Sequence, residues 1–479
     1  MRAILPAALL SLLASVHAAV TITDPGQDAF NFTASAAELS GLTWLAGSTY
    51  HAVSDATNQR KVYELNIGVD PTNGRITGAS IVQTITLAAG YDLEGIAYCR
   101  PRGTWFISDE GQHPAGGFIR EHSLPDGNLV RTVTIPAVIL NDRPNFGFES
   151  CTWGAGALWT ANEEALTQES ALSTASSGSL IRLQKFDRLL NPSGQWAYQT
   201  DSFGFDSPAI NAERSGVSDL LALPDGNLLV LERTLGIGFI PSYRNRIYLV
   251  NFTGATDVSG ISDLDGAAFT PVTKTLLWEK NMGSISTRNF EGIALGPALP
   301  LIGGTSYSVL LVADNGSGTQ QHLYALIANG VVAPSPIAQW RQGFWGTTST
   351  AGISADDADP DDDGLRNLLE YALGGDPRNA TQNPLPLAST ASGNLVLTFN
   401  RNITNTDITL IVQAADNLAG TWTDLAQSVN GDAMTALVGG VTLAESGAGA
   451  TRSVQVRDIF PIGDPAHTPR FMRLKAIHP

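Results

Sequence analysis

The sequence predicts an all-β protein: a β-propeller, then an acidic calcium loop with a short helix, then a small β-sandwich. Composition is the first reason, because the 479 residues include 48 Gly and 25 Pro and only 15% of them are charged. So low a charged fraction with so many turn-forming residues is typical of β-rich proteins, and not of helical bundles or disordered chains. An internal repeat and a change of composition near residue 335 are the other two reasons.

Residues 1–18 have the pattern of an export signal. Arg2 is followed by an apolar run from Ala3 to Val16, and Val16 and Ala18 stand at the −3 and −1 positions of a cut after Ala18. The run is shorter than the ~20 residues of a membrane helix. We therefore expect a signal peptide and a bacterial protein that is secreted or held at the cell surface, with a buried N-terminal helix as the alternative.

The charge balance excludes several partners. Lys and Arg number 28 against 45 Asp and Glu, which gives a formal net charge of −17, and no run of basic residues is present. A surface this acidic repels nucleic acid and anionic membranes. We expect neither a nucleic-acid partner nor a membrane span.

Five segments share one pattern: an acid or Ser, then small and apolar residues, then a short apolar strand that ends in an acid or amide. They start at Ser40-Gly41-Leu42-Thr43, Glu94-Gly95-Ile96-Ala97, Glu149-Ser150-Cys151-Thr152, Ser218-Asp219-Leu220-Leu221 and Glu291-Gly292-Ile293-Ala294. The matching strand ends are Val53-Ser54-Asp55, Ile107-Ser108-Asp109, Thr160-Ala161-Asn162, Val230-Leu231-Glu232 and Val312-Ala313-Asp314. A repeat of this length is typical of propeller blades.

Turn signals such as Pro125-Asp126-Gly127 and Pro224-Asp225-Gly226 separate the strand-like runs, as in antiparallel blades. We expect residues 19–335 to form a ring of six blades at ~40–50 residues each, with five as the alternative. The sixth blade would lie around Gly266 to Trp278 or combine the two ends of the repeat region. An up-and-down barrel is the rival fold. Cys99 and Cys151 lie about one repeat apart, so either a disulfide or two buried thiols is consistent with the sequence.

Residues 336–384 are expected to be a linker with a short helix over 337–346 and a calcium loop. The run Asp359-Pro360-Asp361-Asp362-Asp363-Gly364, with Glu370 after five further residues, matches D-x-[DN]-x-[DN]-G-x5-E. Calcium takes six to eight oxygens, which this spacing supplies around the turn at Gly364. The expected ligands are Asp359, Asp361, Asp363, the carbonyl of Leu365, Asn367 and Glu370.

All of these ligands would be used in holding the ion, so its role would be structural. A helix should begin at Asn367 and end at Gly374-Gly375, and a solvated acidic linker is the alternative. Residues 385–479 return to alternating strands and predict a β-sandwich. The segment 337–479, with Asn-Leu-Leu-Glu-Tyr-Ala-Leu-Gly at 367–374, resembles a C-terminal module of exported proteins from Verrucomicrobia-like bacteria, which implies attachment or display.

The repeats place carboxylates at equivalent positions, so blades in register would gather them around one funnel. Acids at the starts are Asp92, Glu94, Glu149 and Glu291, and acids at the strand ends are Asp109, Glu110, Glu163, Glu232 and Asp314. Such a ring is costly unless protons or cations neutralise it. Calcium is the natural counter-ion of an exported protein and would let an acidic funnel hold a phosphate.

The runs Asp92-Leu93-Glu94-Gly95-Ile96-Ala97, Leu231-Glu232-Arg233-Thr234 and Phe290-Glu291-Gly292-Ile293-Ala294, with Ala313-Asp314-Asn315, resemble the bacterial phytase-like family, "esterase-like activity of phytase". The resemblance covers about 36–335 and implies a propeller with phosphoesterase activity on a small phosphorylated substrate. It implies metal ligands or general bases at Glu94, Glu110, Glu149, Glu163 and Glu291. Arg233 would be the clamp for phosphate oxygens.

A structural reading stands beside this one. Acids at strand ends also brace neighbouring blades, and Glu232 and Arg233 also fit ion pairs within the protein. The chain would then be a non-catalytic propeller that binds a ligand or partner. Serine hydrolases of the G-x-S-x-G type, P-loop enzymes, dinucleotide-binding folds and HExxH zinc enzymes are excluded, because their motifs are absent.

Overall fold

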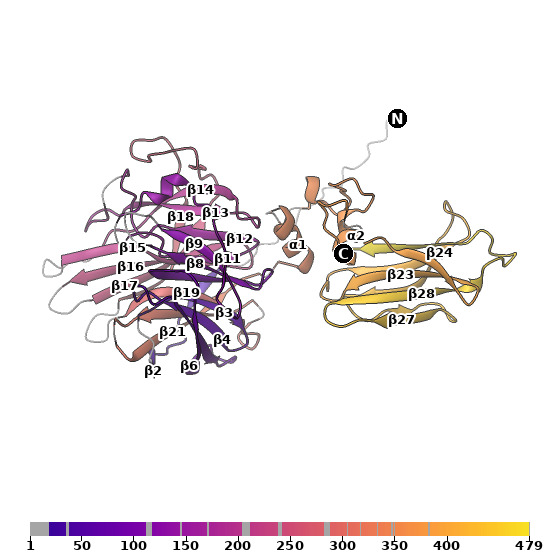
Figure 1. Cartoon of the computed structure of the whole chain (residues 1–479), viewed down its shortest axis with the longest axis horizontal. Coiled ribbons are helices and arrows are strands. Elements are labelled where there is room, and N and C mark those ends of the chain that lie inside the picture. The colour runs from indigo at the N-terminus through magenta and orange to yellow at the C-terminus, as the bar shows by residue number, and fades with distance from the viewer. Residues whose placement is uncertain are drawn as a thin grey trace, which may run out of the picture. The chain divides into compact units, whose positions relative to one another are not determined.

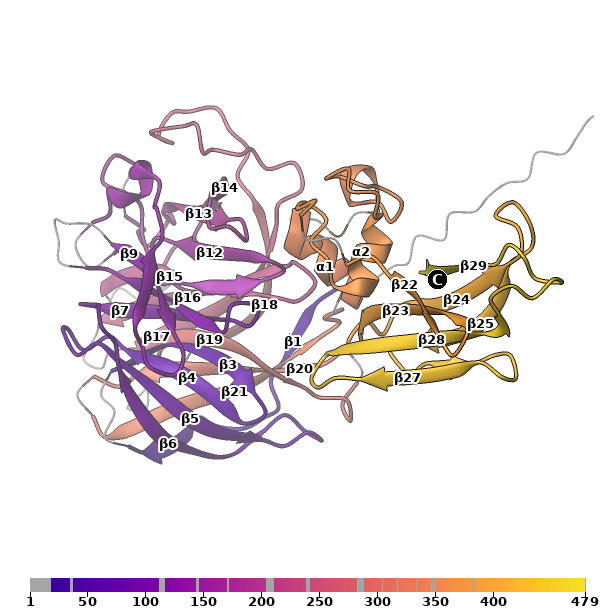
Figure 2. The same cartoon turned by 45° about the vertical axis from the view of Figure 1, so that its right-hand side comes forward.

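The computed structural model describes residues 19–34, 38–111, 117–143, 146–169, 172–203, 211–237, 242–281, 288–303, 305–316, 318–332, 334–345, 348, 350–381 and 384–478. The predicted export signal, residues 1–18, lies outside them. The chain divides into two compact units, one up to residue 333 and the other over Pro334–Pro479. Figures 1 and 2 show strands throughout both units, with two short α-helices in the second.

Among the described residues the first unit consists of five antiparallel sheets; four are built from strands that follow one another in the chain, and the fifth also contains β1 and β2. Sheet 1 contains β3 (Leu39–Ala46), β4 (Thr49–Ser54), β5 (Lys61–Val69) and β6 (Ile76–Thr86). Sheet 2 contains β7 (Leu93–Cys99), β8 (Thr104–Asp109), β9 (Phe118–Ser123) and β10 (Leu129–Thr132). Sheet 3 contains β11 (Thr152–Gly154), β12 (Ala157–Ala161), β13 (Leu180–Phe186) and β14 (Pro192–Gln199).

Sheet 4 contains β15 (Asn211–Ala222), β16 (Leu228–Ile237), β17 (Ser242–Asn251) and β18 (Thr273–Asn281). Sheet 5 contains β19 (Asn289–Ala298), β20 (Tyr307–Asp314) and β21 (Gln320–Asn329), and both β1 (Thr21–Thr23) and β2 (Phe30–Thr33) pair with β21. A 3-10 turn, η1 (Ala137–Leu140), precedes β11.

The five sheets form a closed ring. Their first strands β3, β7, β11, β15 and β19 contact one another in that order, and β19 returns to β3. An apolar cluster fills each interface between neighbouring sheets: sheets 1 and 2, 2 and 3, 3 and 4, 4 and 5, and 5 and 1. The chain is therefore a β-propeller, as predicted.

The number of blades differs from the preferred prediction of six. Among the described residues the propeller has five sheets, which was the stated alternative. The segment around Gly266 to Trp278 supplies β18, the outer strand of sheet 4, and the two ends of the repeat region combine in sheet 5.

Small residues let the inner strands approach one another closely. A Cβ on Gly95 of β7 would lie 2.4 Å from the backbone nitrogen of Cys151, and one on Gly41 of β3 would lie 2.5 Å from the carbonyl oxygen of Glu94. Contacts this short exclude any side chain, and they explain the small residue after the acid or Ser in the repeat. The ring of inner strands is consequently packed backbone against backbone.

Cys99 and Cys151 are both buried free thiols in the apolar cluster between sheets 2 and 3. Burial raises the pKa of the Cys99 thiol to about 12. Of the two states that the sequence left open, the structure has the reduced one, in which the thiols act as small apolar core groups.

The second unit is a β-sandwich with two helices. One sheet has the order β22 (Leu387–Ala391), β23 (Asn394–Asn402), β28 (Thr451–Pro461), β27 (Thr442–Ser446). The other has the order β26 (Thr435–Ala436), β25 (Thr423–Val429), β24 (Thr409–Ala415), β29 (Phe471–Ile477). Before them come α1 (Pro336–Trp345), the 3-10 turn η2 (Gly352–Ser354) and α2 (Asn367–Leu373).

The helices belong to the core of this unit and not to a free linker. Tyr371, Ala372 and Leu373 of α2 lie in one apolar cluster with Ile337 of α1 and residues of both sheets. The helix α2 has the predicted bounds, and it ends at Gly374, whose φ of +82° is the left-handed conformation of a helix C-cap. The segment 336–384 is thus part of the same folding unit as the sandwich.

Candidate functional site

The carboxylates of the repeats gather at one edge of the propeller. In each sheet the second strand runs antiparallel to the first, so the first strand starts beside the end of the second. Residues at or just before the start of the first strand therefore lie at the same edge of the sheet as residues at or just after the end of the second strand. Asp92, Glu94 and Glu291 occupy the first kind of position, and Asp55 and Asp314 the second. The ring of blades brings these equivalent positions to the same end of the central axis.

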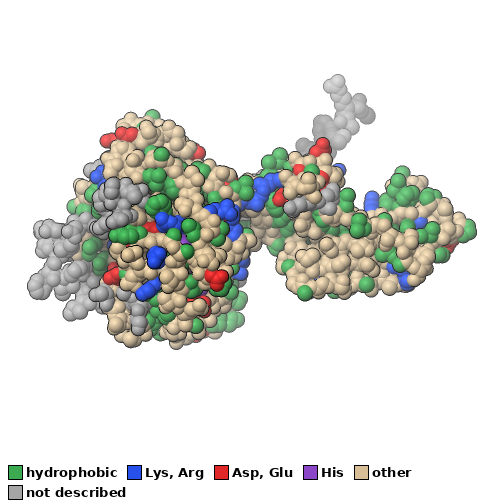
Figure 3. All heavy atoms as spheres, in the orientation of Figure 1, with side chains coloured by type: hydrophobic (Ala, Val, Ile, Leu, Met, Phe, Trp, Pro, Cys, Tyr) green, Lys and Arg blue, Asp and Glu red, His purple; other side chains and the backbone are tan. Residues whose placement is uncertain are grey.

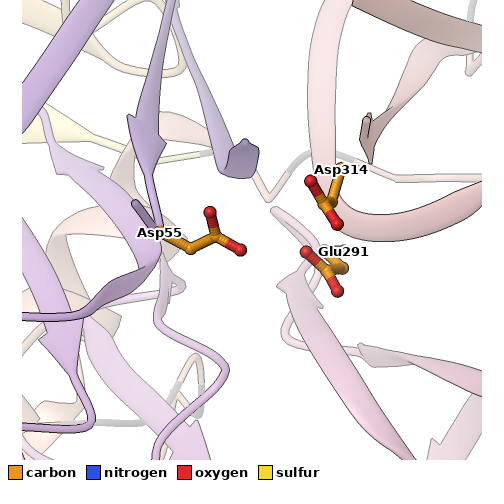
Figure 4. A group of neighbouring side chains, drawn as sticks. All are labelled: Asp55, Glu291 and Asp314. Atoms are coloured by element: carbon orange, nitrogen blue, oxygen red, sulfur yellow. The ribbon is translucent and has the colours of Figure 1, made fainter. Parts of the chain in front are cut away.

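One acidic group joins sheets 5 and 1. Oxygens of Asp55, Glu291 and Asp314 lie within 4.8 Å of one another, and Figure 4 shows Asp55 pointing across the gap between blades toward the other two. Asp55 Oδ1 and Glu291 Oε2 are buried and accept no hydrogen bond from the described residues. Burial, followed by the charges of its acidic neighbours, raises the pKa of Asp55 to about 9, and burial raises that of Glu291 to about 8.

A second acidic group lies on sheet 2. Oxygens of Asp92, Glu94 and Glu110 lie within 4.8 Å of one another. The buried carboxylate of Asp109 positions this group, because it accepts hydrogen bonds from the backbone N–H of Asp92 (3.1 Å) and of Gly111 (2.8 Å). Burial raises the pKa of Glu110 to about 7.

Glu94 and Glu149 connect the groups electrostatically. Burial raises the pKa of Glu94 well above its usual value, and the next causes are the charges of Glu149, Asp55, Glu110 and Glu291. Burial also raises the pKa of Glu149, with Glu163 and Glu110 as the next causes. Four of the five blades therefore contribute acids to one strongly negative site.

Arg233 of β16 brings a positive charge from the remaining blade. One terminal nitrogen donates to Glu163 Oε1 at 2.6 Å, and the other donates to Asn289 Oδ1 at 3.0 Å and lies 3.3 Å from Glu291 Oε1. The side chain is 6% exposed. Its terminal nitrogens thus contact Glu163, Asn289 and Glu291 within the protein, where the guanidinium acts as an internal counter-charge. The role of Arg233 as a phosphate clamp stays a prediction.

The other acids that the sequence analysis singled out fall into two sets, those near the acidic groups and those with structural partners. Glu94, Glu110, Glu149, Glu163 and Glu291 lie close enough for their charges to interact, and their roles as metal ligands or bases stay predictions. Asp109 and Glu232 instead have structural partners: Glu232 faces away from Arg233, accepts from Tyr198 Oη at 2.6 Å and pairs with Lys274 Nζ at 2.5 Å. Neighbouring residues of a strand point to opposite faces, which explains why Glu232 and Arg233 never meet.

Asp55 is absent from the acids that the sequence predicts around the funnel, whereas Asp92 and Asp314 are among them but have no predicted role as ligand or base. The repeat itself carries the signal, because Asp55 is the strand end of the first repeat as Asp314 is that of the fifth. Applying the same position to every repeat would have added Asp55.

This arrangement suits hard cations. Carboxylate oxygens are the ligands that calcium and magnesium prefer, and like charges this close cannot all ionise without a positive partner. The unpartnered oxygens of Asp55 and Glu291 fit an ion between sheets 1 and 5. In the second unit, Asp359, Asp361 and Asp363 form a third group with oxygens within 4.8 Å of one another.

Comparison with solved structures finds distant likenesses. The chain is similar to the Dos1 propeller, with 9% identity, a TM-score of 0.24 and coverage of 61% of this chain and 67% of that one. It is similar to a glycoside hydrolase, with 10% identity, a TM-score of 0.31 and coverage of 89% and 96%. It is also similar to the GH43 BlXynB protein from Bacillus licheniformis, with 11% identity, a TM-score of 0.31 and coverage of 93% and 96%.

None of the curated proteins matches the chain. In the part of the chain that the structure describes, neither helix is long and apolar enough to cross a membrane. On the face drawn in Figure 3, hydrophobic side chains are spread in small groups over both units.

Residues 35–316 match the family described as "Phytase-like: Esterase-like activity of phytase". This range contains both acidic groups of the propeller, Arg233 and every strand from β3 to β20. It is more than half of the chain, and the protein therefore belongs to the phytase-like family.

Proposed function

We propose that the protein is an exported, calcium-assisted phosphoric-ester hydrolase whose active site is the acidic edge of the propeller. The observation that carries the proposal is the pair of carboxylate groups, Asp55/Glu291/Asp314 and Asp92/Glu94/Glu110, each with oxygens within 4.8 Å of one another. Family membership supports the reaction class.

A site with this many acids repels a phosphate by itself. Calcium, when bound, supplies the positive charge that holds phosphate oxygens and stabilises the charge that develops on them. Asp55, Glu291 and Asp314 would hold one ion, and Asp92 and Glu94, beside Glu110, a second. Because carboxylates of sheets 1 and 5 would share the first ion, this ion would also brace the ring between these two blades.

Glu110 is the best candidate for proton transfer. Burial raises its pKa to about 7 in the metal-free protein, and a neighbouring cation would favour the ionised carboxylate, the form that accepts a proton from a water that attacks the ester. The backbone N–H of Gly147 donates to its Oε1 at 2.6 Å, which fixes the carboxylate while its other oxygen remains for the reaction. Arg233 keeps Glu163 and Glu291 in place through the contacts described above.

The test uses the full-length protein. Phosphate release is measured from phosphomonoesters and phytate, and release of the alcohol from phosphodiesters, each with calcium and with a chelator. We expect turnover of at least one ester that the chelator abolishes, and a loss of at least 100-fold in kcat/KM when Glu94→Gln and Glu291→Gln are combined.

Asp126→Asn is the matched control, because it removes one negative charge from an exposed turn residue that lies outside both acidic groups. It should keep full activity. No turnover of any ester by folded, calcium-loaded protein would refute the hydrolase and favour the alternative, a propeller that only binds a ligand or partner. Activity that survives the double substitution would refute the site.

A further inference from the structure

The acidic loop of the second unit, residues 359–370, has the geometry of an ion site. Asp359 holds the turn, since its carboxylate accepts hydrogen bonds from the backbone N–H of Asp363 (3.3 Å) and of Gly364 (3.0 Å). Asp363 in turn accepts from the N–H of Leu365 at 2.8 Å. The backbone thus curls so that oxygens of Asp359, Asp361 and Asp363 converge within 4.8 Å of one another.

Glu370 provides an independent sign of a ligand. Its side chain comes from α2, it is 1% exposed, and both of its carboxylate oxygens are buried without a hydrogen-bond partner among the described residues. A buried carboxylate that lies near other acids and accepts no hydrogen bond is strongly destabilising unless a cation neutralises it.

Asn367, at the start of α2, adds another buried oxygen that accepts no hydrogen bond from the described residues. Its Nδ2 donates to the carbonyl oxygens of Ile353 (2.9 Å) and Ala355 (2.7 Å), while its buried Oδ1 has no partner in the described part of the chain. The amide is therefore held by its nitrogen, which leaves the oxygen for a ligand.

The chain also keeps space for the Glu370 carboxylate. A Cβ on Gly375 would lie 2.4 Å from Glu370 Oε1, so any side chain there would displace the carboxylate. The Glu370 carboxylate thus has space around it, accepts no hydrogen bond from the described residues and lies near three converging acids. This arrangement favours a bound ligand over solvent.

We propose that this loop is a calcium site that stabilises the second unit. The oxygens available are one each from Asp359, Asp361, Asp363 and Asn367, the carbonyl of Leu365 and both of Glu370. Seven oxygens with a bidentate carboxylate suit calcium, whereas magnesium prefers six ligands in a strict octahedron and keeps several waters. This proposal does not depend on the hydrolase activity of the propeller.

The ion would tie the loop to the rest of the unit. Leu368 N–H donates to the carbonyl of Asp356 at 3.0 Å, and the Asp356 carboxylate pairs with Arg341 of α1 and with His478 Nδ1 at 3.0 Å. Glu370 itself lies on α2, whose next three residues are in the core. Calcium therefore connects α1, α2 and the end of the last strand.

The test is hydrogen–deuterium exchange of the full-length protein, with calcium and with a chelator, read on peptides that cover residues 351–378. We expect calcium to slow exchange in α2 at least tenfold in the unsubstituted protein. Glu370→Gln should abolish this effect, since it keeps the shape of the side chain but removes the charge. Calorimetry should show one calcium site fewer in the same variant.

Asp362→Asn is the matched control. It removes one charge from the same loop, but Asp362 is exposed and its φ is +59°, a conformation that Asn tolerates, so calcium protection should persist. Glu94→Gln with Glu291→Gln should also leave the protection of α2 unchanged, which separates this site from the propeller.

Peptides of β23 and β28 show whether Glu370→Gln still folds; if it does not, Asp361→Asn takes its place. The proposal is overturned if calcium does not change exchange in α2 of the unsubstituted protein, or if the protection survives in a folded variant. Equal protection by magnesium at equal concentration would overturn the assignment to calcium.

Discussion

Arg233 shows how a single side chain offsets negative charge among the buried acids. It pairs with Glu163 and Glu291 while it is itself buried, whereas no Lys or Arg of the described residues pairs with Asp55 or Glu94. A buried pair contributes little net stability, but removal of one partner leaves an uncompensated charge. Arg233 is therefore a positioning residue that compensates part of the negative charge of the acidic ring in the absence of metal.

We predict that Arg233→Met lowers the free energy of unfolding of the propeller by about 3–5 kcal/mol in the presence of a chelator. Denaturant unfolding measures the change. The control is Arg131→Met, which removes a half-exposed partner of Glu121 and should cost less than about 1 kcal/mol. Equal effects of the two substitutions would contradict the role assigned to Arg233.

The raised pKa values predict how the metal-free propeller responds to pH. The folded pKa values of Glu110 (about 7), Glu291 (about 8) and Asp55 (about 9) lie above the unfolded values near 4. The folded state therefore binds more protons between about pH 4 and pH 9, and its stability falls as the pH rises through this window. The slope is about 1.4 kcal/mol per pH unit for each extra proton that is retained.

Urea unfolding at a series of pH values in a chelator checks this prediction. Calcium should flatten the slope, because it replaces the protons that the folded state would otherwise keep. A metal-free propeller that becomes more stable between pH 5 and pH 8 would contradict it.

At the scale of single elements, the packing of the inner strands makes a sharp prediction about glycine. Gly95→Ala should destabilise the propeller by about 1–3 kcal/mol or more, because its Cβ would overlap the backbone of β11's neighbour Cys151 at 2.4 Å. Gly78→Ala on β6 is the control, since nothing lies within 4 Å of its Cβ, and it should be close to neutral. The midpoint of thermal unfolding is measured for both variants. An unchanged midpoint in Gly95→Ala would mean that the inner strands are not packed as described.

The elements also show what the sequence can and cannot predict. The inner pairs of strands were predictable, because they carry the repeated acids and apolar runs. The outer strands were not, since β6 and β10 are largely exposed and carry no repeated residue. This is why β18 was mistaken for part of a further blade and why β1 and β2 were not assigned to sheet 5.

The helix α2 was predictable to the residue, because its calcium-loop start and its Gly-Gly end are both local signals. The site was predictable in part for a similar reason: position in the repeat indicates which acids share an edge. The position of a residue in its repeat does not reveal which residues of other blades it contacts. The contacts of Arg233 with Glu163 and Glu291 join residues 70 and 58 positions apart, and only the closed ring brings them together.

At the scale of the whole molecule, calcium should act on the two units separately. The propeller should gain about 2.7 kcal/mol at a calcium concentration 100 times the dissociation constant of its site. In Glu94→Gln/Glu291→Gln this gain should vanish while the second unit keeps its own. Denaturant unfolding followed by exchange on peptides from each unit measures both, and a joint loss in the two units would contradict separate sites.

The pairing of β1 and β2 with β21 has a consequence for the order in which the chain can fold. Residues 21–33 are synthesised almost 300 residues before their partners at 320–329. Until then the early strands have an unpaired edge, and the closure of so long a loop makes the last step slow. A nascent chain must therefore keep β1 and β2 from pairing wrongly while the other four blades assemble. The ring becomes complete only when β1 and β2 pair with β21.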